Sequence, residues 1–409
     1  MPSFIRFLVL TGLLIFLGLP FVVRGQDANQ QRPRRVNQGT EQSAPNGSAQ
    51  AKEPIRDQAA KPQDVDDGDV VRVETQLVSV PAVVTGNGGR PLIGLQAENF
   101  ALFENGEQQR IANFATTETP FEIALLLDTS GSTRADVALI RQAATAFVAA
   151  LRPGDRVAIV GFNTSGSGKS TTAKVEVLAK LTDDRRTLQK AIENLGSSNG
   201  TPYYDALLKV ADDIFNEAPR AEMRGRRAVV ALTDGVDSSS ESEFQPARAK
   251  LLRAGIACYF IQVNTEEFVE DRLLKDCQED GRLTLSQKQM QRYRRVFAPK
   301  TRPEDYLEFC EMGSFERMEV SRGLYNLARR EMNDLGKASG GKSFLAASLQ
   351  DARAAFALVA AEIGTQYSLG YYPSNKARDG KYRTIKVVVQ GVSDKPQVRA
   401  REGYYAPKS

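Results

Sequence analysis

Histidine is absent from this 409-residue chain, and its absence removes several classes of function. Without an imidazole there is no Ser-His-Asp or Cys-His catalytic arrangement. Imidazole ligation of zinc is excluded for the same reason. Enzymes without histidine exist, but most common hydrolase mechanisms are therefore closed to this protein.

The chain also lacks an excess of either charge, because 54 Lys and Arg residues accompany 50 Asp and Glu residues, for a net charge of +4. No basic stripe interleaved with aromatic residues occurs along it, and such a stripe is typical of nucleic-acid binding. We therefore expect no nucleic-acid partner. The hydrophobic fraction of 41% is that of a globular protein, and the length is sufficient for two or more domains.

Cysteines are few, with only Cys258, Cys277 and Cys310 in the chain. Cys258 lies in an apolar strand pattern, which predicts a buried thiol. In an oxidising compartment Cys277 and Cys310 could pair, and the sequence does not decide whether they do.

Long hydrophobic runs are lacking except at the N-terminus, where Arg6 precedes an apolar stretch from Phe7 to Val23. This pattern predicts an export signal over residues 1–25. The stretch is long for a signal peptide and short for a membrane span, so an uncleaved anchor is the alternative. We expect a secreted or periplasmic protein, in contact with a membrane only if this segment is retained.

Composition and strand patterns divide the rest of the chain. Residues 26–70 are rich in Gln, Asn, Pro, Ser and Ala, which predicts a disordered linker. Alternating apolar positions and the turn Glu104-Asn105-Gly106 predict β-strands over residues 71–120. Three more strand patterns occupy residues 365–409. An economical arrangement places the leading and trailing strands in one β-sandwich, with a second domain inserted between them.

Buried strands alternate with helices across residues 121–364. Near-continuous apolar runs are typical of strands that helices cover on both faces, and they occur here as EIALLLD, DRVAIVGFN, RRAVVALTDG and GIACYFIQVN. AKVEVLAKLT alternates like an edge strand. The alternation predicts a doubly wound, mostly parallel α/β sheet of Rossmann-like class. A charged, helical segment at about 265–333 is too long for a connection, and we predict a helical insertion there.

Oxygen-bearing side chains follow these strands. Asp128, Ser130 and Ser132 alternate after the first buried strand, Thr201 precedes a helix, and Asp234 ends another buried strand. Ligands of open α/β sheets bind at the carboxyl ends of strands. Hard oxygen donors suit Mg²⁺, Mn²⁺ or Ca²⁺. We therefore predict one metal site from all five residues, since a helix cap would explain only one of the first three.

The D-x-S-x-S pattern, the loop threonine and the T-D-G aspartate together resemble the metal-ion-dependent adhesion site (MIDAS) of von Willebrand factor type A (VWFA) domains. The resemblance covers roughly Phe121 to Ile363, apart from the insertion. The flanking strand patterns resemble those of bacterial exported proteins usually labelled VWFA-related. The resemblance implies a divalent cation, Mg²⁺ first, that is held by the five residues named above.

It also implies a function. In such sites the carboxylate of a partner's Asp or Glu fills an open position on the cation. We expect an exported, non-enzymatic adhesion or protein-binding module, with a shift of the last helix (about Leu349 to Ile363) coupling binding to the sandwich. A scaffold subunit with a structural metal and a metal-dependent hydrolase are the alternatives. Against the hydrolase, no general base or phosphate clamp is evident beside the ligands.

Other polar patterns are assigned structural roles. The acids Asp136, Asp205 and Asp237 are predicted to be solvated. The run Ser165–Ser170 has asparagine where a phosphate-binding loop needs its first glycine, so we expect it to rim the metal site. The charge run Arg292–Arg302 is predicted to form a solvated helical face.

Overall fold

A computed structural model describes residues 77–87, 90–116, 118–130, 137–167, 170–217, 226–276, 285–306, 308–393 and 395–408. The predicted signal peptide and linker lie outside the described residues, as do Ser132, Asp136 and Cys277. The segment Val71–Ser409 is one compact unit. Within the described residues, no helix combines the length and apolarity that a bilayer crossing needs.

A six-stranded sheet forms the centre of this unit, in the order β10-β9-β8-β5-β6-β7. Its strands are β5 (Glu122–Leu127), β6 (Arg156–Ser167), β7 (Ser170–Thr182), β8 (Arg227–Thr233), β9 (Ala257–Val263) and β10 (Lys342–Ala346). Five strands run parallel, and only the edge strand β7 pairs antiparallel, with β6. Every residue of β5, β8 and β9 is buried, as continuous apolar runs predict.

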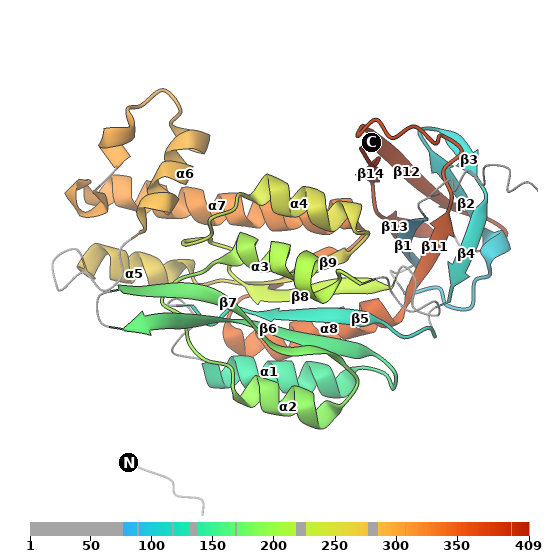
Figure 1. Cartoon of the computed structure of the whole chain (residues 1–409), viewed down its shortest axis with the longest axis horizontal. Coiled ribbons are helices and arrows are strands. Elements are labelled where there is room, and N and C mark those ends of the chain that lie inside the picture. Colours follow the sequence, from blue (N-terminus) through green and yellow to red (C-terminus); the bar gives the residue numbers. More distant parts are fainter. Residues whose placement is uncertain are drawn as a thin grey trace, which may run out of the picture. The chain divides into compact units, whose positions relative to one another are not determined.

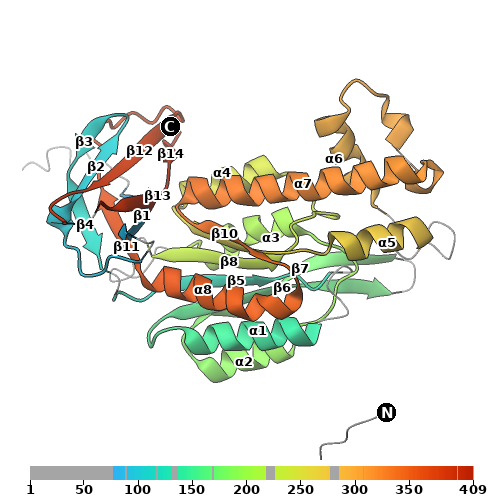
Figure 2. The ribbon, with the colours of Figure 1, turned by 180° about the vertical axis from the view of Figure 1, so that it is seen from behind.

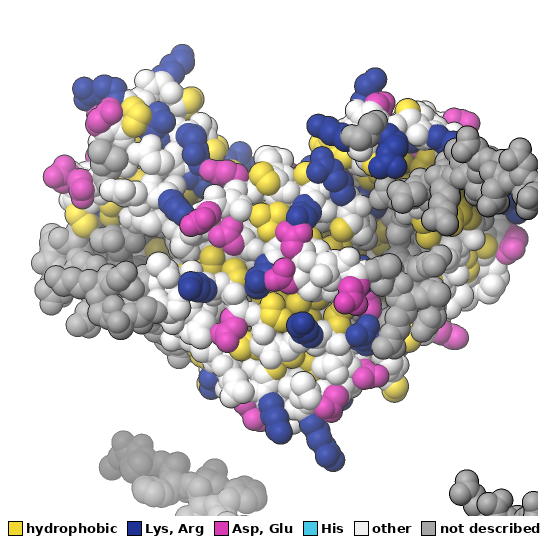
Figure 3. All heavy atoms as spheres, viewed as in Figure 1, with side chains coloured by type: hydrophobic (Ala, Val, Ile, Leu, Met, Phe, Trp, Pro, Cys, Tyr) yellow, Lys and Arg dark blue, Asp and Glu magenta, His cyan; other side chains and the backbone are white. Residues whose placement is uncertain are grey.

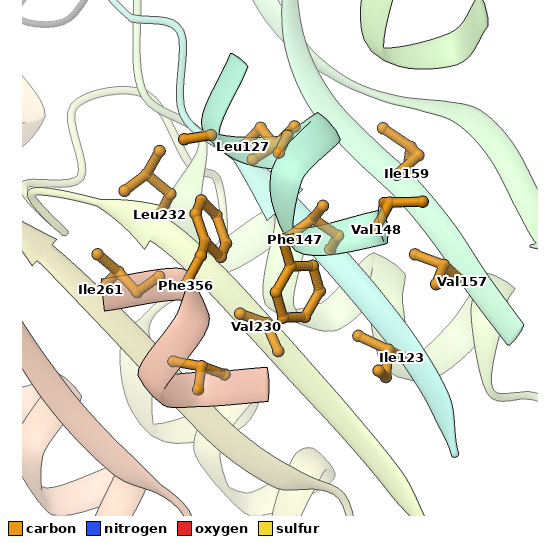
Figure 4. Packing of buried hydrophobic residues seen from close by; sticks show 14 of the residues in the cluster. Ile123, Leu127, Phe147, Val148, Val157, Ile159, Val230, Leu232, Ile261 and Phe356 are labelled. Carbon is orange, nitrogen blue, oxygen red and sulfur yellow. The ribbon is translucent and has the colours of Figure 1, made fainter. Parts of the chain in front are cut away.

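Helices cover both faces of this sheet, with α1, α2 and α8 on one face and α3, α4 and α7 on the other (Figure 1). Their bounds are α1 (Val137–Ala150), α2 (Arg185–Glu193), α3 (Tyr203–Lys209), α4 (Phe244–Arg253), α7 (Ser314–Ser339) and α8 (Ala352–Gly364). Ile123 of β5 faces the first layer and Ala124 the second, because successive strand residues point to opposite sides. In Figure 4, Phe147 of α1 and Phe356 of α8 meet over the strands, with ring centroids 5.1 Å apart.

The leading and trailing strands form two four-stranded sheets, ordered β13-β1-β11-β4 and β14-β12-β2-β3. Their bounds are β1 (Val78–Thr85), β2 (Phe100–Glu104), β3 (Glu107–Gln109), β4 (Ile111–Ala115), β11 (Gln366–Tyr371), β12 (Tyr382–Val389), β13 (Gln397–Ala400) and β14 (Gly403–Tyr405). One apolar cluster joins the two sheets, with members such as Val80, Leu102, Tyr367 and Val387. The predicted fold class is confirmed: a doubly wound α/β sheet lies between the strands of a small sandwich.

The segment predicted as an insertion contains α5 (Glu266–Asp276), α6 (Gln287–Phe297) and the first turns of α7. These helices share a small apolar cluster that includes Val269, Met290 and Leu324. The later turns of α7 pack on the central sheet through residues such as Met332 and Leu335. The single helix α7 therefore begins in the segment predicted as an insertion and ends in the layer that covers the sheet.

The cysteines occupy different environments. Cys258 on β9 is a free thiol with no exposed surface, and burial raises its pKa to about 12. Its apolar strand pattern predicts this position. Cys310 is disulfide-bonded. Cys277, with which the sequence leaves a pairing open, lies outside the described residues.

Candidate metal centre

Asp128 directly follows β5, and its side chain is fully buried. Its Oδ1 accepts a hydrogen bond from the Ser130 N–H at 3.0 Å, and its Oδ2 accepts one from the Thr233 hydroxyl at 2.6 Å. The Asp128 N–H donates to the Leu232 carbonyl at 3.0 Å, which links the end of β5 to that of β8. The carboxylate is thus held from both sides.

Asp234 directly follows β8 and is 4% exposed. Its Oδ1 accepts from the Val236 N–H at 3.0 Å, and its Oδ2 accepts from the Thr265 hydroxyl at 2.7 Å. Strands β5 and β8 are parallel neighbours with Leu127 opposite Leu232. The two aspartates therefore leave the sheet side by side, as the predicted site requires.

The electrostatics of this pair favour a positive ligand. Burial first, and then the charge of the nearby Asp234 carboxylate, raise the pKa of Asp128 to about 7, although hydrogen bonds from Ser130 and Thr233 lower it. Two buried carboxylates repel each other when both are ionised. A bound cation would offset both the loss of hydration and this repulsion, so the pair fits a divalent ion.

Thr201, 6% exposed, lies in the loop before α3. Its N–H donates to the Ser238 hydroxyl oxygen at 2.8 Å, and its carbonyl accepts from the Ser238 N–H at 3.1 Å. In the same loop, the Ser198 N–H donates to the Thr129 carbonyl at 2.9 Å. Hydrogen bonds thus join the three ligand-bearing loops into one unit.

The structure brings four of the five predicted ligands to one edge of the sheet. Asp128, Ser130, Thr201 and Asp234 are each exposed by 6% or less, whereas Ser132 lies outside the described residues. Among the residues that the structure describes, no three acidic, cysteine or histidine side chains form a metal cluster. The donors are two carboxylates and hydroxyl groups, a set that suits a hard cation. The assignment of each ligand stays a prediction.

Asp237 does not have the solvated position predicted for it. It is 7% exposed, and its carboxylate accepts from the Tyr204 N–H at 3.2 Å, at the start of α3, and from the Ser240 hydroxyl. Asp205 is half-buried, and its carboxylate accepts two backbone N–H groups of the 234–242 loop. Both acids satisfy backbone donors of distant segments, and such pairing leaves no local sequence signal.

Two threonines of the centre also escape the sequence patterns. Thr233 stands next to Asp234 in the T-D-G motif, so attention to the whole motif would have found it. Thr265 is 31 residues from Asp234, and its hydroxyl also contacts the Tyr325 hydroxyl, 60 residues further on. Only the tertiary structure reveals that contact.

The arginine-rich run is not solvated along its whole length. Arg292 is 9% exposed, donates to both carboxylate oxygens of Glu331 at 2.7 Å and lies 4.4 Å from the centroid of the Tyr204 ring. Arg295 and Arg302 are exposed, as predicted. The prediction of a solvated face is therefore wrong for Arg292, because it pairs with the partly buried Glu331 of α7.

A groove of 720 Å³ lies beside the centre. Its walls come from the loops that carry Thr201 and Asp234, from β7, from α3 and from the start of α6, and include Lys174, Asn199, Gly200, Lys209, Ser238 and Lys288. Over the face shown in Figure 3, basic and acidic side chains are interspersed, so neither sign of charge dominates it. The groove offers room for a partner next to the proposed ligands.

Comparison with known proteins identifies one domain. A family model described as the von Willebrand factor type A domain matches residues 122–291. A search of curated proteins finds no match.

Solved structures with a similar arrangement include three from different sources. A von Willebrand factor type A protein from Catenulispora acidiphila is 12% identical, with a TM-score of 0.38 over 77% of this chain and 76% of that one. Proximal thread matrix protein 1 from the mussel byssus is 13% identical, with a TM-score of 0.35 over 59% and 47%. The vWF domain of the type V pili tip protein Mfa5 from Porphyromonas gingivalis is 20% identical, with a TM-score of 0.23 over 29% and 38%.

Proposed function

Because this chain carries a von Willebrand factor type A domain, a fold known for protein-binding and adhesion modules, we propose that it is an exported module that binds a partner protein through a divalent cation. The cation would be Mg²⁺, with Mn²⁺ and Ca²⁺ as alternatives, and its ligands would be Asp128, Ser130, Ser132, Thr201 and Asp234. The observation that carries this proposal is the buried aspartate pair on adjacent parallel strands, beside hydroxyl-bearing loops.

The ligand set suggests what kind of partner fits. A bound divalent cation supplies a positive centre that accepts additional hard oxygen ligands. Only two of the five proposed ligands carry a formal charge, so the protein itself neutralises the cation only partly. The side chains of Thr233 and Thr265 hold one oxygen of each aspartate. A partner's Asp or Glu carboxylate would complete both the coordination and the charge balance.

Export belongs to the same proposal. The N-terminal pattern of residues 1–25 is that of a signal peptide. The disulfide at Cys310 fits an oxidising compartment. We propose a secreted or periplasmic location, with an anchored form if the segment is not cleaved. Recovery of the protein only from the cytoplasm of its native cells would contradict this location.

Metal titration tests the centre. We expect calorimetric titration of Mg²⁺, Mn²⁺ and Ca²⁺ into the metal-stripped chain to reveal one site, and Asp128→Ala to abolish it. The matched control is Glu241→Ala, which removes an exposed acid at the groove beside the same loops. Absence of binding in the parent chain, or binding that survives Asp128→Ala, would contradict the proposal.

Selection of peptides tests the acidic partner. Random peptides displayed on phage would be captured on the immobilised chain in Mg²⁺ and released with EDTA. We expect the released pool to be enriched in Asp or Glu, and we expect Asp128→Ala to capture no such pool. Metal that raises thermal stability without any such enrichment would favour the scaffold alternative. Metal-dependent turnover of nitrophenyl esters or phosphates would favour the hydrolase.

A further inference from the structure

Each aspartate of the centre is held by a threonine hydroxyl that has a second partner. The Thr233 hydroxyl donates to Asp128 Oδ2 at 2.6 Å and accepts from the Gly235 N–H at 2.8 Å. The Thr265 hydroxyl donates to Asp234 Oδ2 at 2.7 Å and lies 2.7 Å from the Tyr325 hydroxyl. Because a hydroxyl has a single proton, Thr265 must accept from Tyr325 while it donates to Asp234.

The two pairs differ in where the second donor comes from. Gly235 is two residues from Thr233, so that interaction is local to the T-D-G turn. Tyr325 lies on α7, 60 residues from Thr265, and both residues are buried, at 4% and 6% exposure. The row of hydrogen bonds from Tyr325 through Thr265 to Asp234 therefore forms only because the helical segment folds against the sheet edge.

Two ion pairs join α5 to α7, the helices next to Thr265 and around Tyr325. Glu266 of α5, which follows Thr265 directly, pairs with Arg329 of α7 at 2.5 Å. One turn further along α5, Glu270 pairs with Arg322 of α7 at 2.8 Å. Figure 2 shows α5 running beside α7, and the two helices pack together. Because Arg322 and Arg329 lie on either side of Tyr325 along α7, the two ion pairs fix the position of Tyr325 relative to Thr265.

Helix α6 holds the loop that follows Asp234. The Ser286 hydroxyl, at the start of α6, donates to the Ser238 carbonyl at 2.7 Å. Lys288 Nζ donates to the carbonyls of Ser239 and Ser240 at 3.2 and 2.9 Å. Helix α6 thus contacts the loop after Asp234 directly, whereas α7 acts through Tyr325 and Thr265.

We propose that Thr265 and Tyr325 are positioning residues of the metal centre, through which the helical insertion sets the affinity for the cation. The inference depends on the proposed metal site. Neither residue would touch the cation, and both act by fixing the orientation of the Asp234 carboxylate. Loss of a hydrogen-bond partner behind a metal ligand typically lowers metal affinity about 10–100-fold.

Calorimetric titration of Mn²⁺ into the metal-stripped full chain tests this role. Tyr325→Phe keeps the ring in its apolar cluster and removes only the hydroxyl. We expect it to raise the Mn²⁺ dissociation constant about tenfold. The stoichiometry and the unfolding temperature in EDTA should not change. Tyr293→Phe is the matched control, because Tyr293 packs against the same cluster, and it should leave the dissociation constant unchanged.

Two variants of Thr265 separate positioning from packing. Thr265→Val keeps the shape and removes the hydroxyl, so it should weaken Mn²⁺ binding at least as much as Tyr325→Phe. Thr265→Ser keeps the hydroxyl and should restore binding. Parent-like affinity in both Tyr325→Phe and Thr265→Val would overturn the positioning role and leave the metal site intact. Absence of Mn²⁺ binding in the parent chain, or binding that persists in Asp128→Ala, would instead overturn the proposed function and this inference together.

Discussion

Single side chains at the centre work mainly by accepting or donating hydrogen bonds across chain segments. Asp128 and Asp234 each use one oxygen to accept a nearby backbone N–H, at residues 130 and 236, and the other to accept a threonine hydroxyl. Burial is the largest cause of the raised pKa of Asp128, and the charge of Asp234 is the second. A bound cation would offset both the cost of burial and the repulsion between the two carboxylates.

Asp237 allows a prediction at the same scale. Burial raises its pKa to about 6 from the ordinary 3.8, so the folded chain binds the proton more tightly than the unfolded chain does. Stability should therefore fall as pH rises between about 4 and 6, by up to roughly 3 kcal/mol from this group. Asp237→Asn, which stays neutral, should remove that part of the pH dependence.

Urea unfolding of the parent and Asp237→Asn in EDTA between pH 4 and 8 measures this difference. The pKa values of Asp128 and Glu331 are also raised, and these two groups affect stability in the same way in the parent and in Asp237→Asn. The prediction therefore concerns the difference between the two curves. Parallel curves would show that burial does not raise the pKa of Asp237 as proposed.

At the scale of single elements, strand β10 begins where the backbone at Gly341 approaches that of β9 very closely. A Cβ added to Gly341, directly before this strand, would lie 1.9 Å from the carbonyl oxygen of Cys258 on β9. Strands β9 and β10 pair in parallel from Tyr259 and Lys342 onward. Only a residue without a side chain permits this approach at the start of the strand.

Gly341→Ala should therefore destabilise the protein by about 3 kcal/mol or more, because backbone rather than a flexible side chain must move. The matched change is Gly313→Ala, where the nearest atom is Glu316 Oε2 at 3.4 Å. Urea unfolding of both variants measures the difference. Equal stability of the two would mean that β9 and β10 separate at little cost.

At the scale of the whole compact unit, buried arginines join the sandwich to the α/β domain. Arg226, 1% exposed, donates to the carbonyl of Thr116, directly after the sandwich strand β4, and to that of Gln366, the first residue of β11. Arg401, 3% exposed, donates to the Leu252 carbonyl on α4 and to the Ser79 carbonyl on β1. Burial lowers the pKa of these side chains to about 9 and 10.

Separation of the two parts would leave these guanidinium groups without their acceptors, so we expect one cooperative unfolding transition. Differential scanning calorimetry of the metal-stripped chain should give equal calorimetric and van't Hoff enthalpies. Arg401→Met should lower the unfolding temperature far more than Arg186→Met at an exposed helical position. Two resolved transitions in the parent chain would contradict this cooperativity.

Much of the architecture follows from local patterns. The runs that became β5, β8 and β9 are apolar at nearly every position, and this pattern is typical of strands covered on both faces. Asp128 and Asp234 could be placed because each directly follows such a strand, and parallel strands bring their carboxyl ends to one edge. Patterns of this kind need only neighbouring residues to be informative.

The sequence by itself therefore determined the class of fold, the edge of the sheet that carries the centre and the oxygen chemistry of its candidate ligands. Only the tertiary structure decided that Asp237 is buried at the start of α3, that Arg292 has a partner in Glu331, and that Thr265 and Tyr325 support Asp234. The physical reason is that these contacts join residues 31 to 60 positions apart. Periodicity and capping patterns extend over only a few residues, whereas such distant contacts form when whole helices pack against the sheet edge.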